Sequence, residues 1–311
     1  MNPAHIIIFG SMNMDLVART PKLPVPGETL LGYSFATIPG GKGANQAVAV
    51  ARLKVPTVMV GRVGSDGFGQ TLLANLQAAD VDTSGVLVNE AVPSGVAMIA
   101  VDDQSENHII VIPGANGQIN ESDVDRLIHH LPGAAALLLQ FEIPLPAVVA
   151  AAKAAHQAGV RVILDPAPAR SDIPTDLYSC VNIITPNAVE AAQLVGFPVH
   201  DPTTAAHAAD VLQQRGVETV VIKLGATGVF CATPKESFFV PAFSVKAVDT
   251  VAAGDAFNGG MAAALANGLP IRQAITWGAA TGALSATKAG AQSSLPDRAT
   301  VEAFLKQHDR D

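Results

Sequence analysis

The sequence has few of the features that mark secreted or membrane proteins. Only two of its 311 residues are cysteine, Cys180 and Cys231, and their spacing fits neither a CxxC motif nor a metal site. We therefore expect structural thiols in the reducing cytoplasm. No apolar run reaches the roughly 20 residues of a membrane span. The N-terminal stretch also lacks the basic flank and the cleavage site of a signal peptide.

Charged residues are scarce as well, at 15% of the chain, and acidic residues outnumber basic ones by 27 to 19. The formal net charge is -8. Because lysine and arginine form no cluster, we expect neither nucleic acid nor an anionic membrane as a partner. Hydrophobic residues, in contrast, make up 49% of the chain. This length and composition allow a large core, in one sizeable domain or in one domain with a smaller appendage.

Short apolar runs alternate with helical segments along most of the chain. We expect buried strands at residues 5–9, 57–63, 137–141, 160–164, 181–184 and 219–223. The helices between them are expected at residues 68–79, 146–157 and 205–215. Near-continuous apolar strands that alternate with helices predict an α/β fold, with a mostly parallel central sheet and helices on both of its faces.

Two segments, about residues 14–39 and 94–112, interrupt this alternation. Prolines break the first segment, whose strand is expected at residues 28–37, and the second predicts a hairpin across a turn at residues 102–105. We expect both to form a small β-sheet lid on one domain that spans residues 1–311. The lid is too apolar to be freely exposed, so one of its faces should contact the substrate or a second subunit.

The segment 249–260 passes from polar through small residues into an alanine-rich helix. Ala252, Ala253 and Gly254 leave the amides of the first helical turn uncovered. Those amides lack partners within the helix, and the helix dipole favours negative charge, so the turn predicts an anion hole for a phosphoryl group. Asp255 beside it suits a base that takes a proton from an attacking hydroxyl. The alternative is that Asp255 only caps the helix.

Other polar side chains also follow predicted strands, where ligands bind in open α/β sheets. Asn13 and Asp15 alternate, so both can point to one side of an extended segment and contact the hydroxyls of a sugar. A solvated turn is the alternative for these two residues. The further members of this set are Glu142, Asn187, Glu190 and Asp255.

Residues 40–45, with the sequence GGKGAN, form a glycine-rich loop ahead of a helix expected at residues 46–53. A Walker A loop needs serine or threonine after its lysine, whereas Gly43 follows Lys42 here. We expect the glycines to let a ligand approach the backbone closely, with Lys42 and Asn45 supplying polar contacts.

Three motifs, in this order, resemble those of the ribokinase (PfkB-type) family of carbohydrate kinases. They are GGKGANQA at residues 40–47, the pair Asn187 and Glu190 with two residues between them, and DTVAAGDAF at residues 249–257. The resemblance extends over nearly the whole chain. It implies a ribokinase-like fold with a β lid and a homodimer formed through that lid. It also implies phosphoryl transfer from ATP, with Mg²⁺, to a primary hydroxyl.

The resemblance implies roles for individual residues. Asp255 would be the base, and the amides of Ala252, Ala253 and Gly254 would form the anion hole. The sugar contacts fall on Asn13, Asp15, Gly41, Lys42, Asn45, Glu142 and Asp255. The nucleotide contacts fall on Asn187, Glu190, Lys223, Gly225, Gly228 and Gly254. Glu190 would reach Mg²⁺ indirectly, and Lys223 stands where the family more often has threonine or serine.

The resemblance also implies a monovalent cation beside the anion hole, which we interpret as K⁺. Its ligands would be largely backbone carbonyls, and oxygen ligands suit a hard cation. The matching positions are Asp249, Val251, Ser285, Lys288, Gly290 and Ser294.

Within the family, the best match is to members that phosphorylate the O5 hydroxyl of D-ribose to give ribose 5-phosphate. Segments 94–97 and 114–116 contribute to this match. Kinases for 2-deoxyribose, another pentose, fructose or a nucleoside stay open, because one hydroxyl contact can separate them. A sugar sensor without catalysis is the alternative from another class. A sensor would be free to lose Gly254 and Asp255, and both are present.

Overall fold

The apolar runs form one nine-stranded sheet, in the order β13-β12-β11-β10-β9-β8-β1-β4-β5. Neighbouring strands are parallel except at β12, which is antiparallel to both of its neighbours. The structure is a computed structural model that describes residues 4–104 and 106–308. The strands of this sheet are β1 (His5–Phe9), β4 (Thr57–Gly64), β5 (Val81–Asn89), β8 (Ala134–Leu139), β9 (Arg161–Leu164), β10 (Ile183–Ile184), β11 (Thr219–Lys223), β12 (Gly228–Ala232) and β13 (Ser237–Pro241).

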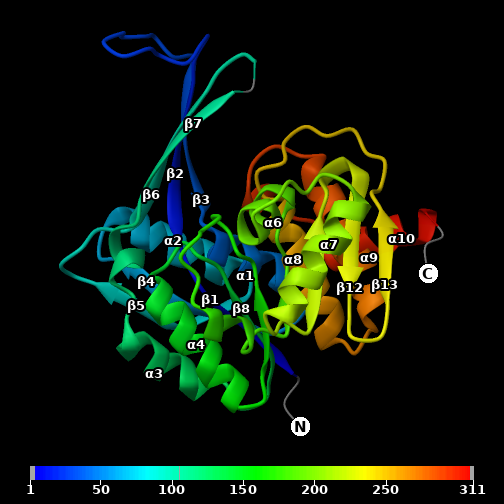
Figure 1. The fold of residues 1–311 in the computed structure, drawn as a ribbon. Helices are drawn as coiled ribbons and strands as arrows, with labels where there is room; N and C mark the ends of the chain where they lie inside the picture. Colours follow the sequence, from blue (N-terminus) through cyan, green and yellow to red (C-terminus); the bar gives the residue numbers. More distant parts are fainter. Residues whose placement is uncertain (1–3, 105, 309–311) are drawn as a thin grey trace.

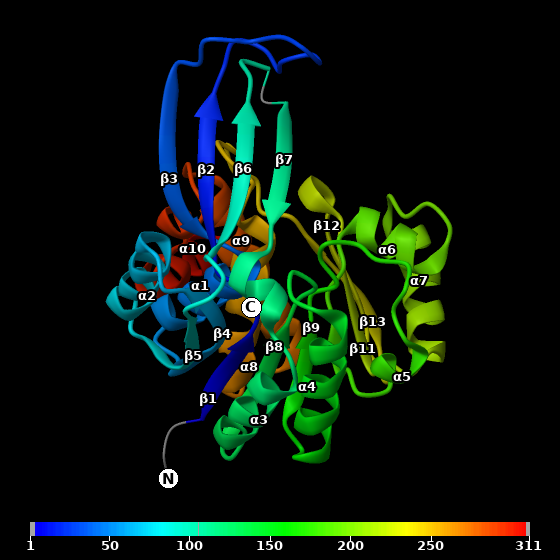
Figure 2. The ribbon, with the colours of Figure 1, turned by 90° about the vertical axis from the view of Figure 1, so that its left-hand side faces the viewer.

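Helices cover both faces of this sheet (Figure 2). One face carries α1 (Lys42–Arg52), α2 (Gly67–Ala78), α8 (Ala253–Ala266), α9 (Ile271–Ala286) and α10 (Arg298–Gln307). The other carries α3 (Glu121–His130), α4 (Leu145–Gln157), α5 (Thr175–Tyr178), α6 (Ala188–Val195) and α7 (Pro202–Gln214). The short 3₁₀ helices among the described residues are η1 (Gly114–Gln118), η2 (Gly225–Thr227) and η3 (Gln292–Ser294).

The two helical layers explain why the strands are apolar on both faces. In β1, Ile6 and Ile8 pack into one core, whereas Ile7 and Phe9 pack into the other. This arrangement confirms the predicted fold class, a mostly parallel sheet between layers of helices. Within the described residues, none of the helices combines the length and the apolar character that a membrane crossing requires.

A second sheet has the order β3-β2-β6-β7 and projects beyond the helical layers (Figure 1). It begins at the carboxyl end of β1, because only residues 10–12 separate β1 from β2. Ser105, in the turn expected at residues 102–105, lies outside the described residues. The role of this sheet as a lid stays a prediction. Its strands are β2 (Asn13–Arg19), β3 (Ser34–Gly40), β6 (Gly95–Val101) and β7 (Asn107–Ile112).

Several elements differ from their expected bounds by one or more residues, and β3, α1 and β10 are among them. The strand expected at residues 28–37 begins only at Ser34, because its partner β2 ends opposite that residue, at Arg19. The helix expected at residues 46–53 begins at Lys42, so most of the glycine-rich loop is already helical. The strand expected at residues 181–184 contains only the two residues of β10.

Gly41 and Gly43 bring the start of α1 against the loop that follows β1. Gly41 has a φ of 88°, in the left-handed region that favours glycine. A Cβ atom on Gly41 would lie 2.7 Å from the backbone nitrogen of Asn13, and one on Gly43 would lie 2.7 Å from the carbonyl carbon of Gly10. Neighbouring backbone therefore fills the space where side chains would lie at both positions. The approach of a ligand to the backbone of this loop stays a prediction.

This close approach predicts the effect of adding one methyl group. Gly43→Ala should lower the free energy of unfolding by about 1–3 kcal/mol, because backbone atoms cannot turn aside as a flexible side chain can. Gly67→Ala is the matched control, since no atom lies within 4 Å of the added Cβ. The control should be neutral or stabilising by up to about 1 kcal/mol. Urea unfolding measures both variants, and equal stabilities would contradict the close approach.

Candidate active site

Asp255 lies in the first turn of α8, with only 4% of its surface exposed. Its Oδ2 atom accepts a hydrogen bond of 2.9 Å from Asn45 Nδ2, and its Oδ1 atom accepts one of 3.1 Å from Gln46 Nε2. Both donors belong to α1. The N-cap of α8 is Ala252, and no side chain caps this helix. The alternative that Asp255 serves as a helix cap is therefore wrong, because its carboxylate points to another helix.

Burial raises the pKa of Asp255 to about 6. The Lys42 ammonium opposes this rise, and the Asp165 carboxylate adds to it. The hydrogen bonds from Asn45 and Gln46 stabilise the ionised form. At neutral pH the carboxylate is therefore ionised and also basic enough to accept a proton in a reaction.

Lys42 and Glu142 lie together beside the loop that follows β1. Glu142 Oε2 accepts hydrogen bonds of 3.0 Å from the Lys42 backbone amide and of 2.5 Å from Ser11 Oγ. This places a carboxylate at the N-terminus of α1, where the helix dipole favours it. Desolvation would lower the pKa of Lys42, but the carboxylates around it, Asp255 first among them, raise it instead. Lys42 is therefore a permanent cation among carboxylates that include Asp255 and Glu142.

Asn13 and Asp15 lie on the same face of β2, as their alternation predicted. Asn13 Oδ1 accepts a hydrogen bond of 2.8 Å from Asn116 Nδ2, which fixes its amide. Partial burial raises the pKa of Asp15 to about 7, and the Glu142 and Asp255 carboxylates add to this rise. Hydroxyl groups of a ligand could donate hydrogen bonds to these carboxylates and so offset their mutual repulsion. The face therefore suits a polyhydroxylated molecule.

The first turn of α8 leaves amides without acceptors. Ala253 donates to Thr250, but the amides of Gly254 and Asp255 bond to no acceptor among the residues that the structure describes. Ala252 is buried, and Gly254 has no side chain to cover them. These free donors at a helix N-terminus form a suitable site for an anion. The assignment as an anion hole stays a prediction.

Asn187 and Glu190 form a capping box at the start of α6. The Glu190 amide donates to Asn187 Oδ1 at 2.9 Å, and the Asn187 amide donates to Glu190 Oε2 at 2.8 Å. The motif therefore has a structural role in the helix whatever else it binds. Burial, aided by the Asp165 carboxylate, raises the pKa of Glu190. The role of both residues toward nucleotide and Mg²⁺ stays a prediction.

Lys223 ends β11 next to this capping box, since its backbone amide donates to Pro186. Gly225 begins η2 and Gly228 follows it, with φ angles of 57° and 137°. At Gly228 a side chain would collide with the backbone of Val240, so this glycine is required by the β12–β13 hairpin.

Two residues of this region were missed by the sequence analysis. Asp165 is 2% exposed, follows β9, and accepts hydrogen bonds from Lys223 Nζ at 3.1 Å and from Gln46 Nε2 at 3.0 Å. Its position directly after a predicted strand is the signal that could have identified it. Gln46 lies in the GGKGANQA motif, but its contacts with Asp165 and Asp255 join residues more than a hundred positions apart and leave no local pattern.

The residues expected around a monovalent cation lie in the loop that leads into α8 and in the segment that joins α9 to η3. Asp249 accepts from the amides of Val251, at 3.0 Å, and Gly290, at 2.9 Å, so its carboxylate joins two loops. Ser285, in the last turn of α9, and Ser294, in η3, share a hydrogen bond of 2.7 Å. Lys288 lies in the turn between them. The structure brings this set together, and its role in cation binding stays a prediction.

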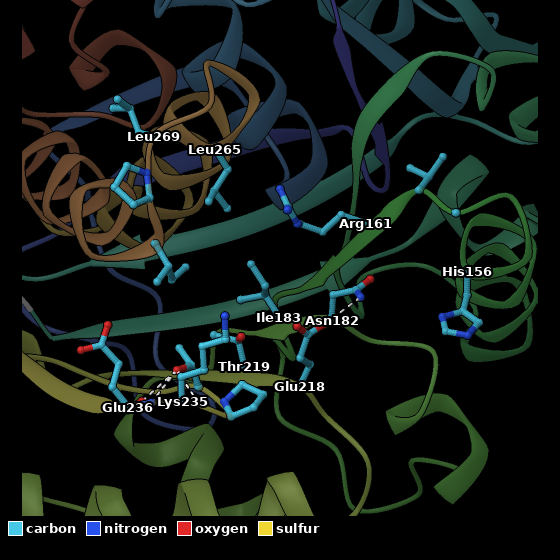
Figure 3. Close-up of a pocket in the computed structure, with 16 residues that line it drawn as sticks. His156, Arg161, Asn182, Ile183, Glu218, Thr219, Lys235, Glu236, Leu265 and Leu269 are labelled. Carbon is cyan, nitrogen blue, oxygen red and sulfur yellow. Dashed lines mark hydrogen bonds between the residues drawn. The ribbon is translucent and has the colours of Figure 1, made fainter.

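A pocket of about 800 Å³ lies at the amino ends of the strands, opposite the carboxyl ends that carry the residues described above (Figure 3). Its lining includes Arg161, Ile183 and Thr219, which are at the amino ends of β9, β10 and β11. None of the predicted site residues lines it. Ligands of open α/β sheets bind at the carboxyl ends, where the acids, Lys42 and the free amides are found, so we place the active site there.

Comparison with known proteins shows what the chain is similar to. Residues 3–298 match the model of the family described as pfkB family carbohydrate kinase. A ribokinase of Haemophilus influenzae is 41% identical over 301 residues, which cover 97% of this chain and 98% of that protein. A deoxyribokinase of Salmonella typhi is 35% identical, and the match covers 97% of that protein and 96% of this chain. A structure of Arabidopsis thaliana ribokinase, complexed with ribose and ATP, has a TM-score of 0.90 at 32% identity and covers 98% of this chain and 99% of its own.

The fold and these comparisons together define an enzyme of the carbohydrate-kinase class. The chain belongs to the pfkB family of carbohydrate kinases. The comparisons confirm the resemblance that the three motifs carried. They do not test the roles of individual residues.

The raised pKa of Asp255 predicts how the reaction depends on pH. A base works in its ionised form, so kcat/KM should fall about tenfold per pH unit below the pKa. With the pKa raised from 3.8 to about 6, this loss should begin near pH 6 and not near pH 4. Asp15 also titrates in this range, so Asp15→Asn is the control and should keep the limb near pH 6. A profile that stays flat down to about pH 5 would contradict the assignment.

Proposed function

We propose that the protein is an ATP-dependent ribokinase, which transfers the γ-phosphoryl group of ATP to the O5 hydroxyl of D-ribose and forms ribose 5-phosphate. One observation carries this proposal. The buried Asp255 carboxylate lies in the same helical turn as the free amides of α8, and it interacts with the charged groups of Asp15 and Lys42. A hydroxyl held by Asp15 and Lys42 and a phosphoryl group held by the amides would both lie next to the base.

Each part of the site has its own role in this reaction. Asn13, Asp15, Lys42 and Glu142 bind and orient the sugar hydroxyls. Asp255 takes the proton of the attacking hydroxyl as the new oxygen–phosphorus bond forms. The amides of Gly254 and Asp255 stabilise the charge on the transferred group. Phosphoryl transfer needs little covalent chemistry from the protein, so positioning and charge stabilisation dominate.

The sugar substrate is the part of the proposal that has a close competitor. One relative is a deoxyribokinase, and a single hydroxyl contact separates ribose from 2-deoxyribose. A coupled assay of ADP release with D-ribose, 2-deoxyribose, other pentoses, fructose and nucleosides decides among them. The proposal expects D-ribose to have the highest kcat/KM. A higher value for another sugar would replace ribose as substrate, and no release with any sugar would favour the sensor alternative.

The residues present fit Mg²⁺ as a companion of ATP. Within the described residues, no group of three or more His, Cys, Asp or Glu could hold a metal by itself. Mg²⁺ in such enzymes is held mainly by substrate phosphates and water, with one or two carboxylates, and there it neutralises phosphate charge. Glu190 is the carboxylate that we assign to this shell.

We place the reaction in the cytoplasm. Cys180 and Cys231 are both free thiols, and Cys231 is buried. Free thiols of this kind are usual where the surroundings are reducing.

We further propose that K⁺ binds between the loop of Asp249 and the loop of residues 285–294. The Asp249 carboxylate already joins the amides of Val251 and Gly290 across these loops. A cation held here by carbonyl oxygens would fix the backbone that leads into the first turn of α8. Its effect on the reaction would therefore pass through the orientation of the anion-hole amides.

Exchange of the cation tests this site. The rate should rise when KCl replaces NaCl at constant ionic strength, because oxygen ligands arranged for K⁺ would hold the smaller Na⁺ less well. Asp249→Ala should weaken this response while the Kd for the sugar stays close to that of the wild type. Equal rates in Na⁺, K⁺ and a bulky organic cation would contradict the proposal.

A homodimer formed through the lid is supported by the face of the small sheet that points away from Asn13 and Asp15. Leu16 is paired with Met98, and Met98 with Ile110, so these side chains lie on that opposite face. Met98 is 51% exposed and Ile110 is 62% exposed. An apolar sheet face of this kind indicates an interface with another surface.

Charged substitutions test the dimer. Met98→Glu and Ile110→Glu should each shift the protein to monomers, because a carboxylate would be buried without a partner. Leu31→Glu is the matched control in the same region, since Leu31 is 90% exposed and outside the sheet. Sedimentation velocity measures the change. A wild-type monomer, or dimers in all three variants, would contradict this interface.

A further inference from the structure

Lys223 provides a second ammonium group at the carboxyl edge of the sheet. It is the last residue of β11, and its Nζ atom lies 3.1 Å from Asp165 Oδ1. The two side chains are 14% and 3% exposed, so the pair is nearly enclosed. A nearly enclosed ion pair keeps its geometry and is poorly screened by salt. The ammonium is therefore held in one place.

That place adjoins the first turn of α8. A Cβ atom built on Gly254 would lie 3.7 Å from Lys223 Nζ. The ammonium thus faces the glycine whose amide has no acceptor among the described residues. Lys223 also acts on Glu190, whose carboxylate it stabilises. The ammonium is therefore close both to Glu190, the predicted Mg²⁺ carboxylate, and to Gly254 of the predicted anion hole.

A hydrogen-bonded chain connects this ammonium to the base. Asp165 accepts from Lys223 through Oδ1 and from Gln46 Nε2 through Oδ2. The same Gln46 amide group donates to Asp255 Oδ1 at 3.1 Å. Gln46 Oε1 accepts a hydrogen bond of 2.7 Å from Gln140 Nε2, and this bond fixes the orientation of the amide. The ammonium and the base are thereby held at a fixed separation.

The carboxylates at the carboxyl edge of the sheet would repel a phosphate group, and an ammonium group there would offset this repulsion. An incoming γ-phosphoryl group would approach the carboxylates of Asp165, Glu190 and Asp255, all of which are buried. Lys42 acts on the carboxylates of Asp255, Asp165, Glu142 and Glu190. Lys223 is the ammonium beside the free amides, where charge develops during transfer.

We propose that Lys223 is a catalytic residue whose ammonium contacts the γ-phosphoryl group of ATP during its transfer, with Asp165 and Gln46 as positioning residues. This rests on the proposed kinase function. The hydroxyl proton passes to Asp255, the new bond forms between the sugar oxygen and the γ-phosphorus, and the bond to the β-phosphate oxygen breaks with its electron pair left on ADP. Lys223 keeps its three protons throughout.

Binding measurements without sugar test the contact independently of turnover. Isothermal titration with Mg²⁺ compares a non-hydrolysable ATP analogue with ADP, in the wild type, Lys223→Met and Lys223→Arg. Lys223→Met should bind the analogue about tenfold or more weakly, as expected for a lost charge-assisted hydrogen bond. Its Kd for ADP should change by less than about threefold, since ADP lacks the γ-phosphate. Equal weakening for both nucleotides, or none for either, would overturn the proposal.

Turnover gives the second readout. Lys223→Met should lower kcat by about 10²–10³, the usual cost of removing one group that stabilises transition-state charge. The KM for the sugar should change little, and Lys223→Arg should recover most of kcat. A kcat for Lys223→Met within about threefold of the wild type would overturn the proposal.

A double variant separates the loss of Lys223 from the exposure of its partner. Lys223→Met leaves Asp165 buried without a cation, which can destabilise the fold or repel phosphate by itself. Lys223→Met with Asp165→Asn removes both charges and should stay as slow as Lys223→Met. Recovery of wild-type kcat in the double variant would show that the Asp165 charge, and not the missing ammonium, caused the loss, and would overturn the proposal.

The two proposals fail in different ways. If the wild type releases no ADP with D-ribose, the proposed substrate fails, and the preference of Lys223 for the ATP analogue over ADP still decides the role of this residue. If the wild type phosphorylates D-ribose and Lys223→Met does so equally fast, the kinase function stands and the role of Lys223 is overturned.

Discussion

The site depends on the close packing of α1 against α8, because only then can Asn45 and Gln46 hold the carboxylate of Asp255. Gly259 makes this packing possible, since a side chain there would collide with Ala49 of α1. Helix α1 is fixed in turn by the loop after β1, against which Gly41 and Gly43 pack without side chains. The base is therefore held in the turn that also supplies the free amides. Base and anion site are two results of one packing arrangement.

The same arrangement concentrates acids at the carboxyl edge of the sheet. Burial and mutual repulsion raise the pKa values of Asp15, Glu190 and Asp255 above their ordinary range. The folded protein holds these groups at a cost to its own stability, which is usual for active sites. Substrates relieve the cost, because hydroxyl donors and a cation that accompanies phosphate both stabilise ionised carboxylates. The electrostatic crowding of the free site thus favours binding of the ligands that the proposed reaction needs.

The strand pattern predicted the architecture because burial on both faces leaves a local record, an unbroken apolar run. Polar residues such as Asn13 and Asp15 could be predicted because they directly follow such a run, where an open α/β sheet binds its ligands. The start of α1 was not predicted, since its glycines are dictated by backbone atoms of Gly10 and Asn13, a contact that no local pattern records. Gln46 and Asp165 were missed because their value lies in hydrogen bonds that exist only after distant helices and strands have packed.

The central claim, that Asp255 is the base of a phosphoryl transfer, is tested most directly by Asp255→Asn. Equilibrium binding of D-ribose and of an ATP analogue should stay close to the wild type, because the asparagine keeps the size of the side chain. The kcat should fall by about 10² or more, as expected when a general base is lost. A variant that binds both ligands and keeps wild-type kcat would contradict the account.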